Sequence, residues 1–327
     1  MQRSFKQISF FLFFVGFFAF SCKDEPVKPN YRAEMRKFVE KISENGRSWH
    51  PGFIVVPQNG LALLSSDGTP QGIAESAYIS AIDGVGQEEL WYGYDGKDDE
   101  TTPAAEHTEL LNMCVFARNH GLKVMVTDYA IADEKIDNSY AKNFENGFIS
   151  FAADHRELDN IPVNPLSPFH SPSNASTFSD SKNFLYLINP SSGYTTKEDF
   201  IRAMEQTHFD VYIIDLYFDE ENRLDTADLN RIRRGHSGYN CKILCYMSIG
   251  EAESYRWYWR PYWNATPPSF LVAEDPYWPD NFSVRYWDPN WQAIICGEGD
   301  SYLRRIVDAG FDGVYLDLVS NYEYFEE

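Results

Sequence analysis

Beyond residue 30, short apolar runs alternate with stretches in which apolar residues recur every three or four positions. Unbroken apolar runs of four or five residues predict strands covered on both faces, as in a parallel sheet. Eight such runs predict eight strands, at 53–56, 78–82, 123–127, 147–151, 184–188, 211–214, 243–247 and 313–316.

Between several of these runs the spacing of apolar residues predicts amphipathic helices, at 31–42, 105–120, 197–206 and 302–309. Gly310 follows the last one, where a glycine commonly ends a helix. Eight strands alternating with helices predict either a (β/α)₈ TIM barrel or a doubly wound sheet. No glycine-rich phosphate-binding motif follows any strand, which weakens the doubly wound alternative.

Segment 160–182 has a different character, because it is rich in Pro, Ser and Asn and lacks periodicity. It reads as a linker between two halves of four strands each, 31–159 and 183–327. We therefore expect one barrel domain over 31–327 with an unusual linker in its middle.

The first 22 residues resemble a lipoprotein signal peptide. Arg3 and Lys6 precede an apolar run at 10–20, which is too short to span a bilayer as a helix, and Cys22 follows directly after Ser21. We expect lipidation at Cys22, a polar tether over 23–30, and export to the outer membrane, with display at the cell surface as a further expectation. The alternative is an ordinary cleaved signal with an incidental cysteine.

Composition narrows the classes of partner. The formal net charge is −21, so the surface repels nucleic acid and anionic lipid, and the lipid anchor is the only membrane contact we expect. Cys114, Cys241, Cys245 and Cys296 fit no metal or disulfide framework, and the seven His residues are scattered. We expect no metal and no cofactor.

Aromatic residues make up 16% of the chain, and many of them fall between 255 and 291 among Pro, Asn and Asp. Trp and Tyr rings in loops stack on the C–H faces of sugars, so this stretch indicates a glycan-binding cleft. The alternative is that these rings only pack a core or loop cluster.

Polar side chains follow the predicted strands, where the active site of a parallel barrel lies. Any single Asp at a strand end is as readily a turn residue, but several at one face indicate a site. The residues concerned are Gln58, Asn59, Asp83, Asp128, Tyr129, Asp215, Ser248, Glu251, Glu253 and Asp317. Glycoside hydrolysis needs one carboxyl as proton donor and another that attacks the anomeric carbon or activates water. The carboxyl ends of these strands, which form the mouth of the predicted barrel, supply both.

Three stretches resemble glycoside hydrolase family 114: SIGEAESYRWYW at 248–259, YWDPNW at 286–291 and GFDGVYLD at 310–317. VPQNG at 56–60 resembles a further motif of the bacterial branch. The resemblance extends over nearly the whole chain from Tyr31 onward. It implies endo-α-1,4-polygalactosaminidase-like activity on an amino-sugar-containing polysaccharide.

The order of the motifs departs from the family, because the half of the barrel that comes second there comes first here. We interpret the chain as a circular permutant, with 160–182 joining the family's old ends. Tyr31 and Glu327 should then lie close together near the catalytic face. The rival interpretation is an exchange of half-domains between two molecules.

The resemblance implies catalytic roles for Glu253 and Asp317, with Asp215 in support. The expected substrate-binding residues are Gln58, Asn59, Asp128, Tyr129, Glu251, Arg256, Trp259, Trp287 and Asp288. We expect a monomer with a polysaccharide or oligosaccharide as its partner. The alternatives are a non-catalytic surface glycan-binding lipoprotein on the same scaffold, and a different barrel hydrolase such as an amidase or deacetylase.

Overall fold

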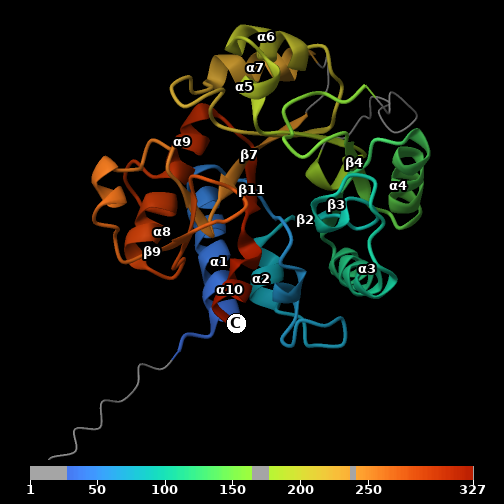
Figure 1. Ribbon diagram of the computed structural model, residues 1–327, viewed down its shortest axis with the longest axis horizontal. Coiled ribbons are helices and arrows are strands. Elements are labelled where there is room, and N and C mark those ends of the chain that lie inside the picture. The colour runs from blue at the N-terminus through green and yellow to red at the C-terminus, as the bar shows by residue number, and fades with distance from the viewer. Residues whose placement is uncertain (1–27, 164–176, 236–240, 327) are drawn as a thin grey trace, which may run out of the picture. The chain divides into compact units, whose positions relative to one another are not determined.

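Parallel strands form the centre of the unit Tyr31–Glu327 in a computed structural model that describes residues 28–163, 177–235 and 241–326 (Figure 1). Two parallel sheets have the orders β1-β11-β7-β6-β5 and β2-β3-β4. Their strands are β1 (Ile54–Pro57), β2 (Gly84–Glu88), β3 (Lys123–Tyr129), β4 (Ile149–Ala153), β5 (Phe184–Leu187), β6 (Val211–Ile214), β7 (Lys242–Ser248) and β11 (Gly313–Asp317).

The two sheets approach one another at both edges. Between β1 and β2, Gln58 bridges to Gly86, and the Asn59 amide donates to the Gly86 carbonyl at 2.8 Å. Between β4 and β5, the rings of Phe151 and Phe184 lie 5.8 Å apart. This parallel α/β arrangement is consistent with a (β/α)₈-type fold.

Helices alternate with these strands along the chain (Figure 1). The first, α1, buries Met35, Phe38, Val39 and Ile42, the apolar face that the spacing predicts. The helices are α1 (Tyr31–Trp49), α2 (Ser76–Ala81), α3 (Ala104–Asn119), α4 (Asp133–Glu145), α5 (Pro190–Gly193), α6 (Lys197–Met204), α7 (Thr226–Gly235), α8 (Pro289–Cys296), α9 (Tyr302–Ala309) and α10 (Tyr322–Glu326). Gly310 ends α9 with a left-handed φ of 96°, as predicted.

The strand predicted at 78–82 is wrong. Helix α2 occupies this segment, and the strand follows at Gly84–Glu88. Because the run has only six helical residues and buries just Tyr78, its apolar content does not distinguish helix from strand. Gly86 marks the true strand, because a Cβ there would overlap the Tyr315 hydroxyl.

This shift moves Asp83 to the beginning of β2, at the end of the strand away from Glu88. There its carboxylate accepts a hydrogen bond from the Val55 amide at 2.8 Å and pairs with Arg47 at 2.9 Å. Asp83 therefore holds the amino-terminal ends of two strands together and takes no part in the predicted mouth.

A small antiparallel sheet, which the sequence analysis does not predict, lies between β7 and α8 along the chain. It has the order β8-β10-β9, from β8 (Glu251–Glu253), β9 (Leu271–Glu274) and β10 (Asn281–Val284). Its strands are only three or four residues long, and the residues of β9 are largely exposed. These strands therefore lack the continuous apolar run that marks the parallel strands.

The first and last described elements of this unit lie side by side, as α1 and α10 show in Figure 1. Arg32 forms a salt bridge with Glu326 at 3.0 Å, and the rings of Tyr31 and Phe325 lie 5.5 Å apart. A permuted barrel needs this proximity. The permutation itself stays a prediction, and Glu327 and 164–176 of the linker lie outside the described residues.

Four cysteines in the described part of the chain, Cys114, Cys241, Cys245 and Cys296, are buried as free thiols. None of the helices in the described ranges combines the length and the apolar character that crossing a membrane requires. Cys22 and the predicted signal peptide lie outside those ranges, so lipidation stays a prediction.

Candidate active site

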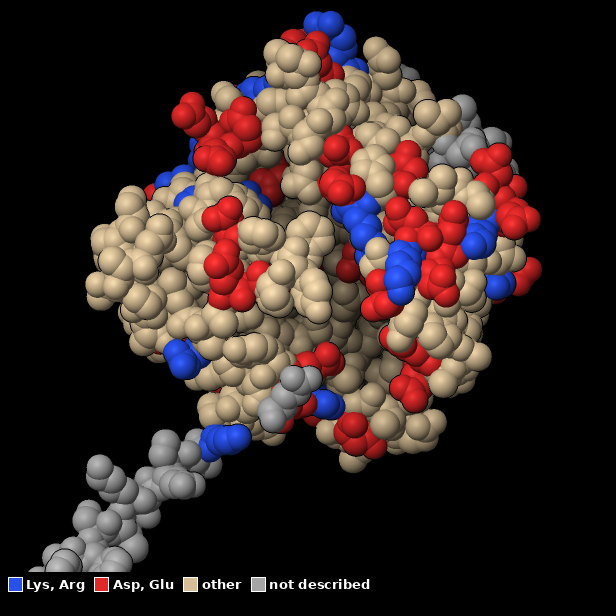
Figure 2. Space-filling view, in the orientation of Figure 1, with Lys and Arg blue, Asp and Glu red and all other residues tan. Residues whose placement is uncertain are grey.

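A cavity of about 920 Å³ opens at the carboxyl ends of the parallel strands. Carboxylates dominate its lining, and they come from many segments: Glu88, Asp95, Asp215, Asp219, Glu220, Glu251, Glu253, Asp275 and Asp317. The two cationic side chains of this lining in the described residues are Arg156 and Arg256. Figure 2 shows acidic side chains gathered around the hollow in this face.

Asp317 ends β11 and points into this cavity. The Tyr246 hydroxyl donates to its Oδ2 at 2.7 Å, and the Leu318 amide donates to its Oδ1 at the same distance. Burial, followed by the negative charge of Glu88, raises the pKa of Asp317 to about 7. Asp317 therefore holds a proton for part of the time at neutral pH.

Glu88 ends β2 and is the carboxylate that the misplaced strand hid from the sequence analysis. Side chains of Gln58, Asn59 and Tyr129 donate hydrogen bonds to it, with the Asn59 amide at 3.0 Å. Asn59 has a left-handed backbone (φ 57°), and its Oδ1 also accepts from the Glu88 amide at 3.1 Å. Three predicted binding residues therefore lie in the cavity as the immediate neighbours of Glu88.

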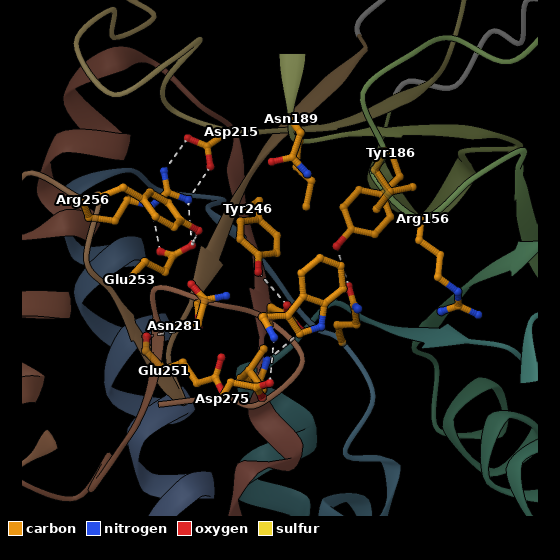
Figure 3. A pocket seen from close by; sticks show the side chains of 18 of the residues that line it. Arg156, Tyr186, Asn189, Asp215, Tyr246, Glu251, Glu253, Arg256, Asp275 and Asn281 are labelled. Atoms are coloured by element: carbon orange, nitrogen blue, oxygen red, sulfur yellow. Dashed lines mark hydrogen bonds and ion pairs between the residues drawn. The ribbon is translucent and has the colours of Figure 1, made fainter. Parts of the chain in front are cut away.

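Asp215 and Glu253 both line the cavity, but Arg256 lies between them and pairs with each (Figure 3). The guanidinium donates to both oxygens of Asp215 at 2.8 and 2.7 Å and to both oxygens of Glu253 at 2.7 and 3.0 Å. Burial opposes the charge of Arg256, yet the two carboxylates outweigh it and hold the pKa of Arg256 well above its ordinary value. The three side chains form one buried ionic cluster.

Glu251 and Asp275 form a second carboxyl pair on the wall of the cavity (Figure 3). Glu251 is 4% exposed. Burial, followed by the negative charges of Asp275 and Asp317, raises the pKa of Glu251 to about 8. Among the described residues no cationic side chain lies between the members of this pair, unlike in the Asp215–Arg256–Glu253 cluster.

Four of the predicted binding residues lie outside the cavity lining. Asp128 is fully buried and accepts from the Trp91 and Tyr92 amides and the Ser139 hydroxyl, so it organises a loop. Asp288 caps α8, with its Oδ1 accepting from the Asn290 amide at 2.8 Å.

Trp259 and Trp287 pack within aromatic clusters. Trp259 contacts Trp263 and Phe282, with ring centroids 5.2 and 5.0 Å away. Trp287 packs on Tyr31 and Phe325 at the meeting of α1 and α10. The packing alternative therefore holds for these two residues.

The aromatic stretch divides between core and cavity. Tyr255, Trp257, Tyr277 and Trp278 line the cavity, whereas Tyr258, Tyr286 and Trp291 are buried. Two tyrosines from strands, Tyr186 and Tyr246, also line it, and sequence analysis missed them because they lie inside apolar runs. Arg156, also missed, lies over the Tyr129 ring at 4.2 Å from its centroid.

Residues 168–327 match the model of the glycoside-hydrolase family GH114. This match supports the assignment of the chain to family GH114. The matched segment carries β5 to β11, including Asp317 and the antiparallel sheet, and so contributes part of the cavity lining, whereas Glu88 and Tyr129 lie outside it.

Three curated relatives of this chain carry the description of uncharacterised proteins. One from Methanocaldococcus jannaschii is 34% identical over 188 residues, 55% of this chain and 49% of the relative. One from Deinococcus radiodurans is 37% identical over 123 residues, 38% of this chain and 37% of the relative, and one from Thermotoga maritima is 43% identical over 84 residues, 26% and 25%. The chain thus spans a quarter to half of the length of these relatives.

Within the described residues, no group of three or more His, Cys, Asp or Glu side chains is arranged to hold a metal ion. The cavity offers carboxyl groups with strongly different surroundings. Asp317 and Glu251 have raised pKa values, and Asp215 and Glu253 form salt bridges with Arg256. Glu88 accepts hydrogen bonds from three side chains.

Proposed function

We propose that this GH114 chain is an endo-acting glycoside hydrolase that cleaves an amino-sugar-containing polysaccharide with Asp317 and Glu88 as its catalytic carboxyl pair. The observation that carries the proposal is that two strand-end carboxyls share one solvent-open cavity, and that the charge on Glu88 helps to raise the pKa of Asp317 to about 7. Such a pair retains one proton near neutral pH, as glycoside hydrolysis requires.

In the proposed reaction, the protonated carboxyl of the pair donates its proton to the leaving glycosidic oxygen as the C–O bond breaks. The ionised carboxyl attacks the anomeric carbon or removes a proton from the attacking water, and one water is consumed in each cycle. Gln58, Asn59 and Tyr129 orient Glu88, and Tyr246 orients Asp317.

The geometry favours Glu88 over Glu253 as the partner of Asp317. Both oxygens of Glu253 accept hydrogen bonds from Arg256, and Oε1 also accepts from the Tyr255 hydroxyl at 2.8 Å. Both oxygens of such a carboxylate are already occupied, and removing it from Arg256 would leave a buried charge unpaired. We assign Glu253, Asp215 and Arg256 the role of supporting the cavity wall.

The charge of the cavity supports a cationic substrate. Nine acidic and two basic side chains line it, so its field attracts a polymer that carries protonated amines. Tyr277 and Trp278 are 86% and 56% exposed at the rim and offer ring faces to sugars. Because the cleft is open, it can accommodate an internal segment of a long polysaccharide, which endo cleavage requires.

Replacement of either carboxyl tests the proposal. Asp317→Asn and Glu88→Gln should each lower kcat on partly deacetylated α-1,4-linked galactosamine polymer by about a thousandfold or more, because each removes one half of the pair. Reducing-end release and mass spectrometry of the products measure the effect within a panel of polysaccharides. If one carboxyl is a nucleophile, azide added to Asp317→Ala or Glu88→Ala identifies it by forming a glycosyl azide.

Asp288→Asn is the matched control, because it makes the same chemical change at a helix cap that Asn also satisfies. It should leave kcat unchanged. If the wild-type protein binds the polymer but cleaves no member of the panel, the chain is a glycan-binding protein, and the proposal is wrong.

A further inference from the structure

Tyr186 lies in β5, and its hydroxyl forms a hydrogen bond at the opposite edge of the same sheet. The residue is 1% exposed, and the hydroxyl donates to Gln58 Oε1 at 2.8 Å (Figure 3). Gln58 directly follows β1, and β1 and β5 are the two edge strands of the five-stranded sheet. This hydrogen bond therefore joins residues that are 128 positions apart in the sequence.

The side chain of Gln58 links Tyr186 to Glu88. A glutamine amide has an oxygen that accepts hydrogen bonds and a nitrogen that donates them. Tyr186 binds the oxygen of Gln58, and the nitrogen donates to Glu88 Oε2. Gln58 is 3% exposed, so bulk water does not replace either partner. The Tyr186 hydroxyl therefore acts on Glu88 through the Gln58 amide.

This link differs from the one that Asn59 makes with the same carboxylate. Asn59 is held locally, because its Oδ1 accepts from the Glu88 backbone amide at 3.1 Å. Gln58 is held by Tyr186, which belongs to the sheet that carries Asp317, whereas Glu88 belongs to the other parallel sheet. The contact of Tyr186 with Gln58 therefore helps to fix the Glu88 carboxyl relative to Asp317.

The surroundings of Tyr186 keep its hydroxyl protonated. Burial, followed by the negative charge of Asp317, raises the pKa of Tyr186 well above its ordinary value. A buried phenol near carboxylates is disfavoured as an anion, so it remains a hydrogen-bond donor. The hold of Tyr186 on Gln58 is therefore constant over the pH range in which the carboxyl pair titrates.

We propose that Tyr186 is a positioning residue, which holds the Gln58 amide and, through it, the Glu88 carboxyl in the place from which Glu88 acts together with Asp317. This inference rests on the proposed function, in which these two carboxyls are catalytic. We expect no hydrogen bond from Tyr186 to the substrate, because Gln58 occupies its hydroxyl and the residue is buried.

Tyr186→Phe removes the hydroxyl and keeps the ring. It should lower kcat on the polymer that the wild type cleaves by about tenfold, and KM should stay within about twofold, because Gln58 loses the partner that holds its oxygen. The alkaline limb of kcat/KM should move to higher pH, since a weaker hydrogen bond leaves the doubly ionised pair less stable. A residue with only a structural role would lower the thermal midpoint without moving this limb.

Gln58→Met tests whether Tyr186 acts through Gln58, because Met has a similar length and neither polar end. This variant should also lower kcat. Adding Tyr186→Phe to it should lower kcat by less than about twofold more, since the contact that Tyr186 makes has already gone. If the two losses multiply instead, Tyr186 acts independently of Gln58, and the inference is wrong.

Tyr315→Phe is the matched control. Tyr315 is also buried in a strand, and its ring lies 5.2 Å from that of Tyr186. Its hydroxyl has no hydrogen-bond partner among the described residues, so the substitution removes the same atom without breaking such a contact. Both kcat and the alkaline limb should stay unchanged. Equal losses of kcat in Tyr186→Phe and Tyr315→Phe would overturn the inference.

Hydrogen exchange measures the hold on Gln58 without requiring hydrolysis. In protein labelled with ¹⁵N-glutamine, the Gln58 side-chain amide gives the NMR signal that is missing from Gln58→Met. Its exchange with heavy water should be about tenfold faster in Tyr186→Phe than in the wild type or in Tyr315→Phe, because the amide is released more often. Unchanged exchange in Tyr186→Phe would overturn the inference.

The two kinds of measurement separate this inference from the proposed function. Faster exchange in Tyr186→Phe, together with no hydrolysis by the wild type, contradicts the proposed function and supports the hold of Tyr186 on Gln58. Hydrolysis by the wild type, together with an unchanged kcat in Tyr186→Phe, contradicts the positioning role alone.

Discussion

At the scale of single residues, Asp317 is the group whose surroundings most favour proton transfer. It is partly buried at the end of β11, it accepts two hydrogen bonds, and Glu88 adds negative charge nearby. A carboxyl in such surroundings remains protonated to higher pH than a carboxyl in water. In the proposed reaction the active form of the Asp317–Glu88 pair carries one proton, whichever carboxyl donates it.

The dependence of kcat/KM on pH should therefore have an alkaline limb with an apparent pKa near 7, above which activity falls because the pair loses its proton. In Glu88→Gln, titration of ¹³C-labelled aspartate by NMR should show a lower pKa for Asp317, since the neighbouring negative charge has gone. Activity that is flat from pH 6 to 9, or an Asp317 pKa unchanged by the substitution, would contradict this coupling.

The sequence predicts some of these site residues and misses others. Asp317 follows a long apolar run and is predictable, as are Gln58 and Asn59 after β1. Glu88 follows Gly-Val-Gly-Gln, a strand with little apolar content, so its strand was misplaced by several residues and Asp83 took its position in the prediction. Gly86 was the available signal, because glycine within a strand often marks a close approach of another group.

At the scale of elements, Arg256 joins the parallel strands to the antiparallel sheet. Asp215 follows β6 and Glu253 belongs to β8, and both pair with this one guanidinium, whose side chain is 8% exposed. The pair of Arg256 with Asp215 depends on three-dimensional proximity across 41 residues, and no local pattern reveals it. The motif resemblance pointed to Arg256, Glu253 and Asp215, but not to their mutual pairing.

Arg256→Ala should lower the free energy of unfolding by about 3–5 kcal/mol, because two buried carboxylates would lose their shared cation. Urea denaturation followed by tryptophan fluorescence measures the change. Arg256→Lys should recover only part of the loss, since an ammonium cannot make both bidentate pairs.

Arg304→Ala provides the comparison, because its pair with Asp308 is an exposed contact within α9, and it should change the free energy of unfolding by less than about 1 kcal/mol. A similar effect of Arg256→Ala and Arg304→Ala would show that the buried cluster does not hold the two sheets together.

At the scale of the whole unit, the alternation of strands and helices was predictable, and seven of the eight apolar runs became parallel strands near their predicted positions. The runs are long and covered on both faces, which makes their signal strong. Apolar spacing does not predict the antiparallel sheet, because its strands are short and partly exposed. The order of the halves is a matter of connectivity, which apolar spacing does not encode.

If the chain is a circular permutant, its connectivity can be reversed without loss of structure. A chain that begins at Thr177, joins Glu327 to Tyr31 through a short Gly-Ser linker and ends at Val163 should fold, because Arg32 and Glu326 already lie 3.0 Å apart. Its free energy of unfolding should stay within about 1 kcal/mol of the parent, as expected for loops of similar length.

Circular dichroism and urea denaturation check this outcome. A matched chain opened inside β7, between Leu244 and Cys245, should not fold, because it divides a buried central strand. Failure of the first chain to fold would count against interchangeable ends.

The antiparallel sheet also bears on how this fold could acquire new specificities. Its three strands come from one continuous stretch, Glu251 to Val284, whereas Glu88 and Asp317 belong to strands far away in the sequence. A single exchanged segment could therefore change this wall of the cavity while the two carboxyls that we propose as catalytic stay untouched. Selection could vary what is recognised and preserve the reaction, because the two tasks are encoded in separate parts of the chain.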